Sequence, residues 1–126
     1  YFSLHLHRAR VSCCRSIAGL EMNIICANTW SSRAAGLLTR PRLKVEEVLW
    51  LNPCHAIHTF GMTYPIAVFF LDQHLQVIDV RSCVKPIRIA YCGRAHSVCE
   101  MLAMKDDQTE FVSSLLTATL LSNTAT

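Results

Sequence analysis

The segment Cys54–His58, which reads CHAIH, holds the side chains best suited to chemistry in this sequence. Thiolate and imidazole are good zinc ligands, and a thiolate beside an imidazole base can also act as a nucleophile. In an extended strand, however, Cys54 and His58 share a face about 13 Å apart, and His55 points to the opposite face. A metal or thiol centre therefore requires a folded loop, or distant partners such as Cys83, Cys92 or His96. The simpler interpretation is a buried cysteine and a histidine that forms a hydrogen bond at a strand end.

Two arginines and one acid form a second constellation. Arg33 and Arg40 flank a short apolar segment, and Arg33 can form an ion pair with Glu100. Such a pair can line a pocket that grips a small anion, or it can simply tie a helix to a sheet. His58 and Thr59 lie near the mouth of a predicted strand and are further candidates for ligand contact. The candidate ligand-binding residues are thus Arg33, Arg40, His58, Thr59 and Glu100.

Several enzyme signatures are missing from the sequence. It contains no G-x-S-x-G nucleophile elbow, no P-loop and no G-x-G-x-x-G. Acids are few, and no pair of them is poised for acid–base work. We therefore assign no catalytic residue and no cofactor, and favour a non-enzymatic binding or accessory module for an unknown small molecule or protein. The alternative is a metal-dependent or thiol enzyme that uses Cys54 and His58.

Composition and charge narrow the class of protein further. The chain has 126 residues, of which 52% are hydrophobic and 17% charged, so it suits one domain with a real core. The net charge is only +3, and no basic run is interleaved with aromatic residues, so a nucleic-acid partner is not expected. No apolar run approaches the roughly 20 residues of a membrane span.

The cysteines indicate a reducing compartment. There are seven of them, an odd number, and no two have the C-x-x-C spacing. This pattern argues against a disulfide framework and against a zinc ribbon. The expected location is therefore the cytoplasm.

The elements that must position these residues are mostly strands. Short apolar segments between turn signals predict a mostly β (α+β) domain, with a compact barrel-like sheet and one short N-terminal helix that Pro41 ends. A C-terminal helix is expected after Lys105, capped by Asp106 or Asp107. The predicted strands are Met22–Cys26, Glu47–Leu51, Cys54–Thr59, Ala67–Asp72, Leu75–Val80, Val84–Ile89 and His96–Ala103.

The strand Ala67–Asp72 is apolar on both of its alternating faces. Such a strand is either central in a sheet that is covered on both sides or part of a barrel wall. The preceding segment, Gly61 to Pro65, is expected to form a turn or bulge. The stretch from His58 to Asp72 therefore indicates sheet construction more than catalysis.

The chain is expected to hold one domain with two extensions. The first methionine is Met22, and the irregular residues 1–21 are predicted to be a non-native or flexible extension. Residues 22–104 form the β-rich domain. Residues 105–126 are expected to be a divergent C-terminal tail.

Five ordered blocks carry a family resemblance. They are Ala27-x-Thr29, the arginine segment from Arg33 to Leu43, His58-Thr59-Phe60-Gly61-Met62, the run from Pro65 to Asp72, and the strand from Val98 to Ala103. Over roughly residues 22–103 this order resembles the prokaryotic family of domain of unknown function 192. The resemblance implies a small, mostly β, barrel-like fold with no established activity. Many members are secreted or membrane-attached, so the cell envelope is the alternative location.

This sequence departs from the family pattern at two places. The family usually has an acid after its Pro-Ile pair, where this chain has Ala67. It usually has glycine after its last strand, where this chain has Met104 and then a tail without glycine. A function that depends on that acid or on that final loop is therefore in question for this chain.

Overall fold

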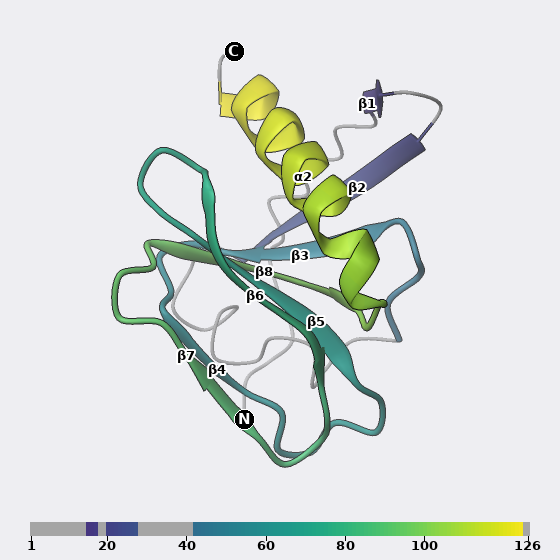
Figure 1. Ribbon diagram of the computed structural model, residues 1–126, viewed down its shortest axis with the longest axis vertical. Coiled ribbons are helices and arrows are strands. Elements are labelled where there is room, and N and C mark those ends of the chain that lie inside the picture. Colours follow the sequence, from purple (N-terminus) through teal and green to yellow (C-terminus); the bar gives the residue numbers. More distant parts are fainter. Residues whose placement is uncertain (1–14, 18–19, 28–41, 125–126) are drawn as a thin grey trace.

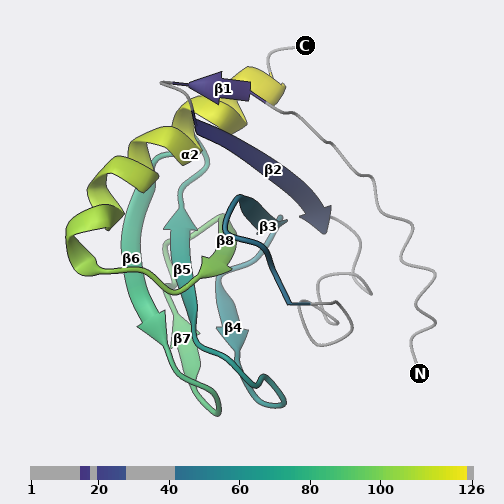
Figure 2. The ribbon, with the colours of Figure 1, turned by 90° about the vertical axis from the view of Figure 1, so that its right-hand side faces the viewer.

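The computed structural model describes residues 15–17, 20–27 and 42–124, which form three layers. The helix α2 (Thr109–Thr124) covers one face of a six-stranded sheet. A two-stranded ribbon of β4 (Ala56–His58) and β7 (Ile89–Tyr91) covers the other face. Figure 1 shows the sheet between α2 and the ribbon, and Figure 2 shows α2 running along the sheet after a quarter turn. The mostly β prediction and the C-terminal helix are confirmed.

The six-stranded sheet is mixed and open. Its order is β1-β2-β3-β8-β5-β6, and the pair β2–β3 is parallel whereas the other pairs are antiparallel. The strands are β1 (Arg15–Ile17), β2 (Leu20–Ala27), β3 (Glu47–Leu51), β8 (Ser97–Leu102), β5 (Ile66–Leu71) and β6 (Val77–Val84).

The barrel-like prediction is wrong. Within the part of the chain that the structure describes, β1 and β6 lie at opposite edges of the sheet and do not pair. The physical reason is that separate layers cover the two faces. A helix on one face and a ribbon on the other bury both sides of a central strand without closing the sheet.

β5 is a central strand that is covered on both sides, which is one of the two arrangements that its sequence allowed. All six of its residues are buried, because their side chains alternate between two cores. Phe69 points to the helix side, and Phe70 points to the ribbon side. On the helix side the core is built from Met22, Ile24, Cys26, Val48, Ala67, Phe69, Leu71, Cys99, Met101, Leu115, Leu116 and Leu120. On the ribbon side it is built from Leu43, Leu49, Leu51, Ile57, Tyr64, Ile66, Val68, Phe70, Val84, Ala90 and Val98.

The C-terminal helix is held by hydrogen bonds at its N-terminus and by one apolar face that packs on the sheet. A 3₁₀ turn, η1 (Asp106–Gln108), precedes α2, and the Thr109 hydroxyl donates to the Asp106 carbonyl oxygen at 2.8 Å. Ser82 on β6 donates to the Asp106 carboxylate, which ties the helix start to the sheet edge. Leu116 and Leu120 are four residues apart, so they lie on one face and enter the helix-side core.

The predicted strand Val84–Ile89 is wrong in its position. β6 ends at Val84 and β7 begins only at Ile89. Pro86 has no N–H to give to a ladder, and Ile87 has a φ of 62°, which is incompatible with a strand. The predicted N-terminal helix, the segment that Pro41 ends, lies outside the described residues.

Candidate functional site

The main candidate site is a pocket at one end of the helix side of the sheet. It has a volume of about 540 Å³ and lies between the end of β3, the start of β8, the β5–β6 loop and the C-terminal part of α2. We call it the Trp50 pocket. Its polar lining residues include Trp50, Asn52, Asp72, His74, His96 and Ser97.

Strand register brings two of these side chains together. Trp50 on β3 pairs with Cys99 on β8, so Ser97 is the diagonal neighbour of Trp50 on the same face of the sheet. Side chains in this relation stand about 7–8 Å apart at the backbone, within reach of an aromatic ring. The flanking residues Leu51 and Val98 point to the ribbon side, which turns Trp50 and Ser97 toward the helix side.

Both of these residues have a buried polar atom without a hydrogen-bond partner among the described residues. The atoms are Trp50 Nε1 and Ser97 Oγ, and the Ser97 residue is only 1% exposed. An indole N–H can only donate, whereas a hydroxyl can donate and accept. Buried polar groups are almost always paired in folded proteins, so two unpaired atoms beside one pocket point to a missing acceptor.

The β5–β6 loop forms the rim of the pocket and is held by Asp72. The Asp72 carboxylate accepts hydrogen bonds from the backbone N–H of His74 at 2.8 Å and of Gln76 at 3.0 Å. The hydrogen bond from Gln76 is the main cause that lowers the pKa of Asp72 below its ordinary value. The carboxylate is therefore ionised at neutral pH. Leu75 completes the turn with a φ of 64°.

Glu100 is a predicted ligand-binding residue that the structure places in the ribbon-side core. It pairs with Leu49 on β3 and with Val68 on β5, and it is 5% exposed. Desolvation by burial raises its pKa from 4.5 to about 8, so the side chain is mostly neutral at pH 7. No hydrogen bond or ion pair of this carboxyl is found among the described residues. Arg33 lies outside them, so its ion pair with Glu100 stays a prediction, as does the role of Arg40.

Thr59 and His58, two further predicted residues, are engaged at the end of the ribbon. Thr59 is buried, and its hydroxyl donates to the Lys85 carbonyl oxygen at 2.7 Å and accepts from the Arg88 N–H at 2.8 Å. His58 Nδ1 accepts from the Phe60 N–H at 3.3 Å, and the two rings lie 5.5 Å apart. In this structure Thr59 ties two loops together, whereas His58 is exposed. Their roles as ligand contacts remain predictions.

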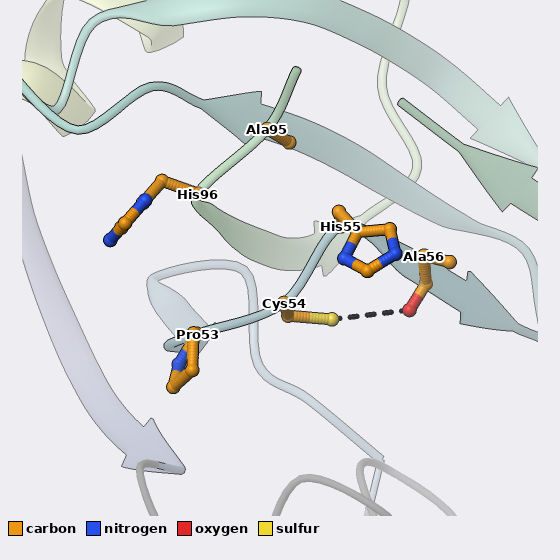
Figure 3. Close-up of a pocket in the computed structure, with 6 residues that line it drawn as sticks. All are labelled: Pro53, Cys54, His55, Ala56, Ala95 and His96. Atoms are coloured by element: carbon orange, nitrogen blue, oxygen red, sulfur yellow. Dashed lines mark hydrogen bonds between the residues drawn. The ribbon is translucent and has the colours of Figure 1, made fainter. Parts of the chain in front are cut away.

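A second pocket, with a volume of about 450 Å³, contains Cys54. Its lining includes His55 and His96 but not His58. The Cys54 thiol donates to the Ala56 carbonyl oxygen at 3.1 Å, and in Figure 3 it points away from the His96 ring. Among the described residues, no group of three or more His, Cys, Asp or Glu side chains is placed to hold a metal ion.

The described cysteines differ in their exposure to solvent. Cys83, Cys92 and Cys99 are free thiols. Burial raises the pKa of Cys99 far above its ordinary value, so this thiol stays protonated and unreactive. Among these thiols, only Cys83 is exposed.

The sequence could not single out the Trp50 pocket. Trp50 sits in an apolar strand and Ser97 begins another, so each has the pattern of an ordinary core position. Their proximity depends on the β3–β8 register, and the rim depends on a loop between two other strands. The only local signal was a polar group inside an otherwise apolar strand, which must find a hydrogen-bond partner somewhere.

These features define a small α+β domain in which an open mixed sheet lies between one helix and a two-stranded ribbon. Residues 14–112 match the model of the family DUF192, described as "Uncharacterized ACR", and the chain belongs to this family. The resemblance found in the sequence is thereby confirmed. No curated protein matches the chain.

Two solved structures are similar to this fold. A protein of unknown function from Novosphingobium aromaticivorans has a TM-score of 0.62 at 16% identity, over 82% of this chain and 88% of that one. A protein from Sinorhizobium meliloti described as "a putative transcription regulator" has a TM-score of 0.62 at 13% identity, over 73% of this chain and 75% of that one. At these identities the likeness establishes the fold alone. Within the described residues, no helix has the length and apolar character of a membrane span.

Proposed function

We propose that the chain is a non-enzymatic binding module that holds a small molecule in the Trp50 pocket. The observation that carries the proposal is the pair of buried donors, Trp50 Nε1 and Ser97 Oγ, which lack partners among the described residues. A buried polar group without a partner costs about 1–3 kcal/mol. A ligand that accepts both hydrogen bonds recovers this free energy when it binds.

The lining of the pocket limits the chemistry of the ligand. The two donors call for an acceptor oxygen such as that of an amide, ester or ketone. The side chains of Leu75 and Leu121 give the pocket an apolar part of its lining. The Asp72 carboxylate stays ionised on the rim, which disfavours an anion beside it. The best fit is therefore a neutral or cationic molecule that carries a carbonyl oxygen next to an apolar group.

Tryptophan fluorescence can test this proposal directly. The chain has two tryptophans, so the variant Trp30→Phe leaves Trp50 as the only fluorophore of this kind. A panel of small amides, lactones and matched carboxylates would be screened by thermal shift and by Trp50 emission. We expect neutral carbonyl compounds to raise Tm and to shift the emission, and the carboxylates to do neither.

Substitution of the donors separates binding from stability. Ser97→Ala removes an unpaired hydroxyl, so the free protein should gain about 1 kcal/mol while affinity for the ligand falls about tenfold. Trp50→Phe should also weaken binding, because it keeps a ring but loses the N–H. Thr63→Ala removes an exposed hydroxyl outside the pocket and is the matched control. Ligands that bind Ser97→Ala as tightly as the parent would refute the proposal.

Thiol chemistry at Cys54 is the second candidate function. It is favoured by one observation, the presence of His55 and His96 beside Cys54 in one pocket. In this arrangement His55, rather than the predicted His58, would act as the base. The rate of Cys54 alkylation by iodoacetamide between pH 5 and 9 tests it, in a variant with Cys83→Ser. A rate that follows an ordinary thiol, with a midpoint near pH 8.5, would exclude an activated nucleophile.

A further inference from the structure

The β4–β7 ribbon and the loops next to it expose several large apolar and aromatic side chains. They are His58, Phe60, Ile87, Ile89 and Tyr91, and together we call them the ribbon surface. Ile89 lies directly opposite His58 in the ladder, and the His58 ring stacks beside Phe60. Ile87, Ile89 and Tyr91 are 64%, 69% and 60% exposed. Clustered exposure of large apolar side chains marks an interaction site more often than isolated exposure does.

Ile87 is held on this surface at the cost of backbone strain. Its φ of 62° lies in the left-handed region, which a β-branched residue rarely adopts. Buried Thr59 fixes this conformation, because its carbonyl oxygen accepts from the Ile87 N–H at 3.2 Å and its hydroxyl accepts from the Arg88 N–H at 2.8 Å. The fold thus strains its backbone to hold an apolar side chain in water. Observed strain of this kind is typical of ligand clamps and other functional sites.

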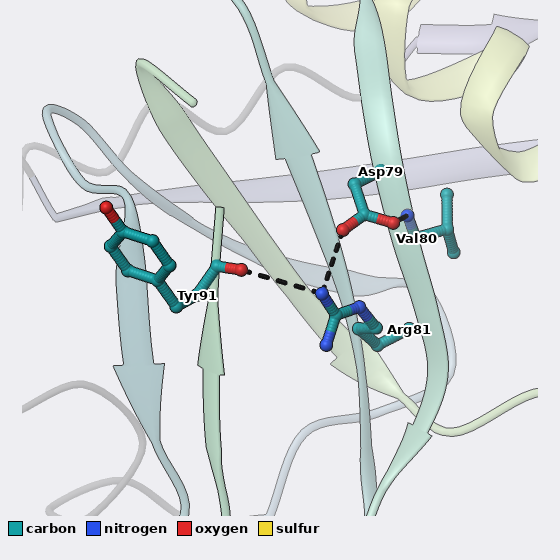
Figure 4. Close-up of polar contacts among 4 residues, drawn as sticks. All are labelled: Asp79, Val80, Arg81 and Tyr91. Atoms are coloured by element: carbon teal, nitrogen blue, oxygen red, sulfur yellow. Dashed lines mark hydrogen bonds and ion pairs between the residues drawn. The ribbon is translucent and has the colours of Figure 1, made fainter. Parts of the chain in front are cut away.

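The charge around the ribbon surface has one sign. Residues 52–65 and 85–96, which include both ribbon strands and the loops around them, contain Lys85, Arg88 and Arg94 but no Asp or Glu. Arg81 on the neighbouring strand β6 does not add to this charge, because it pairs with Asp79 at 3.0 Å. Figure 4 shows the same guanidinium reaching the Tyr91 carbonyl oxygen, which anchors the ribbon to the sheet edge.

We propose that the ribbon surface docks this domain onto an anionic lipid bilayer. Ile87 and Phe60 enter the boundary between headgroups and acyl chains, Tyr91 lies at headgroup depth, and Lys85 and Arg88 meet the lipid phosphates. Each cation near an anionic surface contributes about fivefold to binding. An anionic bilayer fits this surface because its aliphatic and aromatic side chains are accompanied by lysine and arginine and by no nearby acid in the same segments.

Other partners fit the same surface less well. Single-stranded nucleic acid binds by stacking its bases on aromatic rings, and the surface offers such rings at Phe60 and Tyr91. Its two most exposed apolar side chains, however, are the aliphatic Ile87 and Ile89, which suit an acyl chain better than a base. A second copy of this chain would bring Lys85, Arg88 and Arg94 against their own counterparts, which repel one another. Because the ribbon and α2 cover opposite faces of the sheet, docking leaves the helix-side Trp50 pocket open. The lipid proposal and the ligand proposal can therefore fail independently.

Vesicle co-sedimentation of the full chain tests the proposal. The vesicles are phosphatidylcholine alone, and phosphatidylcholine with one quarter phosphatidylglycerol, each at low and high salt. We expect binding to the phosphatidylglycerol vesicles that weakens as salt rises, and little binding to phosphatidylcholine alone. Absence of binding to the phosphatidylglycerol vesicles would overturn the proposal, as would tighter binding of a fluorescent single-stranded oligonucleotide.

Matched variants locate the contact. Ile87→Asn should lower vesicle affinity roughly tenfold, and Lys85→Gln about fivefold. Val45→Asn and Phe111→Ser remove exposed apolar side chains outside the ribbon surface, and neither should change binding. Asparagine tolerates the left-handed conformation, so Ile87→Asn should raise Tm even as it loses lipid binding. Unchanged vesicle binding by Ile87→Asn, or a dimer in sedimentation velocity that this substitution abolishes, would refute lipid docking.

Discussion

The buried acid Glu100 makes the stability of this protein depend on pH in an unusual direction. A carboxyl whose folded pKa is raised keeps its proton in the folded state after the unfolded chain has lost it. Stability is then full below the unfolded pKa of 4.5 and falls as pH rises toward the folded value of about 8. Each pH unit in that interval costs about 1.4 kcal/mol, so the total loss is on the order of 5 kcal/mol. That is a large part of the roughly 5–15 kcal/mol that stabilises a typical domain.

Glu100→Gln removes this dependence while it keeps the shape of the side chain. We expect the free energy of urea unfolding to fall between pH 5 and pH 8 for the parent, and to stay nearly level for Glu100→Gln. The two proteins should be similar near pH 5, and the variant should be more stable at pH 8. Glu110→Gln, which removes an exposed carboxylate from the first turn of α2, is the control and should follow the parent.

The same experiment decides between a neutral and an ion-paired Glu100. The sequence predicts that Arg33 forms an ion pair with Glu100, and such a partner would hold the pKa of the carboxyl low. Stability would then be lost as pH falls through that low pKa, and Glu100→Gln would destabilise the protein near neutral pH. A parent that gains stability from pH 5 to pH 8 would therefore refute our account of an isolated, desolvated acid.

Three further predictions concern single sites. Ile87→Asn should raise the free energy of unfolding by about 1 kcal/mol, because it relieves a left-handed β-branched residue; Ile89→Asn, in an ordinary strand, should not, and equal effects would contradict the strain argument. Asp72→Ala should lower Tm at pH 7, and the difference should shrink as pH falls below the ordinary value of 3.8 and through the lower pKa of the folded protein, because the parent carboxylate is then protonated; a difference that grows as pH falls would speak against the turn hydrogen bonds. Ellman's reagent should modify Cys83 rapidly in the native protein and Cys99 only after unfolding, and early modification of Cys99 would contradict its burial.

Local patterns in the sequence predicted the central elements well. The strand EVLWL has the bounds that its sequence indicated, Glu47–Leu51. The run from Ile66 to Leu71 is buried on both sides, as its two apolar faces require. These predictions succeed because side-chain alternation along one strand is a property of contiguous residues. Which elements cover the two faces of that strand depends on distant residues instead. The same pattern therefore fitted a barrel wall and a layered sheet equally well.

The failures arose where distant residues override local preference. The segment after Val84 has the composition of a strand. The Thr59 hydroxyl, however, forms hydrogen bonds with the Lys85 carbonyl oxygen and the Arg88 N–H, and these bonds hold Ile87 in a turn. The burial of Glu100 between Leu49 and Val68 was not foreseen, because it depends on strand order, and its role as a ligand contact stays a prediction. Trp50 and Ser97 were missed for the same reason. Register and topology decide such pairings, and no local period encodes them.

The ligand-binding and the lipid-docking proposals each depend on residues whose conformation or unpaired polar atoms lower the stability of the folded protein. Ser97 and Trp50 have buried donors on the helix side that find no partner among the described residues, and Ile87 holds a strained backbone next to the ribbon. Sequences that specify a fold satisfy local rules nearly everywhere, and they break them where another requirement competes. The exceptions here lie on opposite faces of the sheet, and in each case one class of partner supplies what is missing. An acceptor oxygen would complete the Trp50 pocket, and an acyl chain would cover Ile87. Random imperfection would scatter such defects without matching them to a partner.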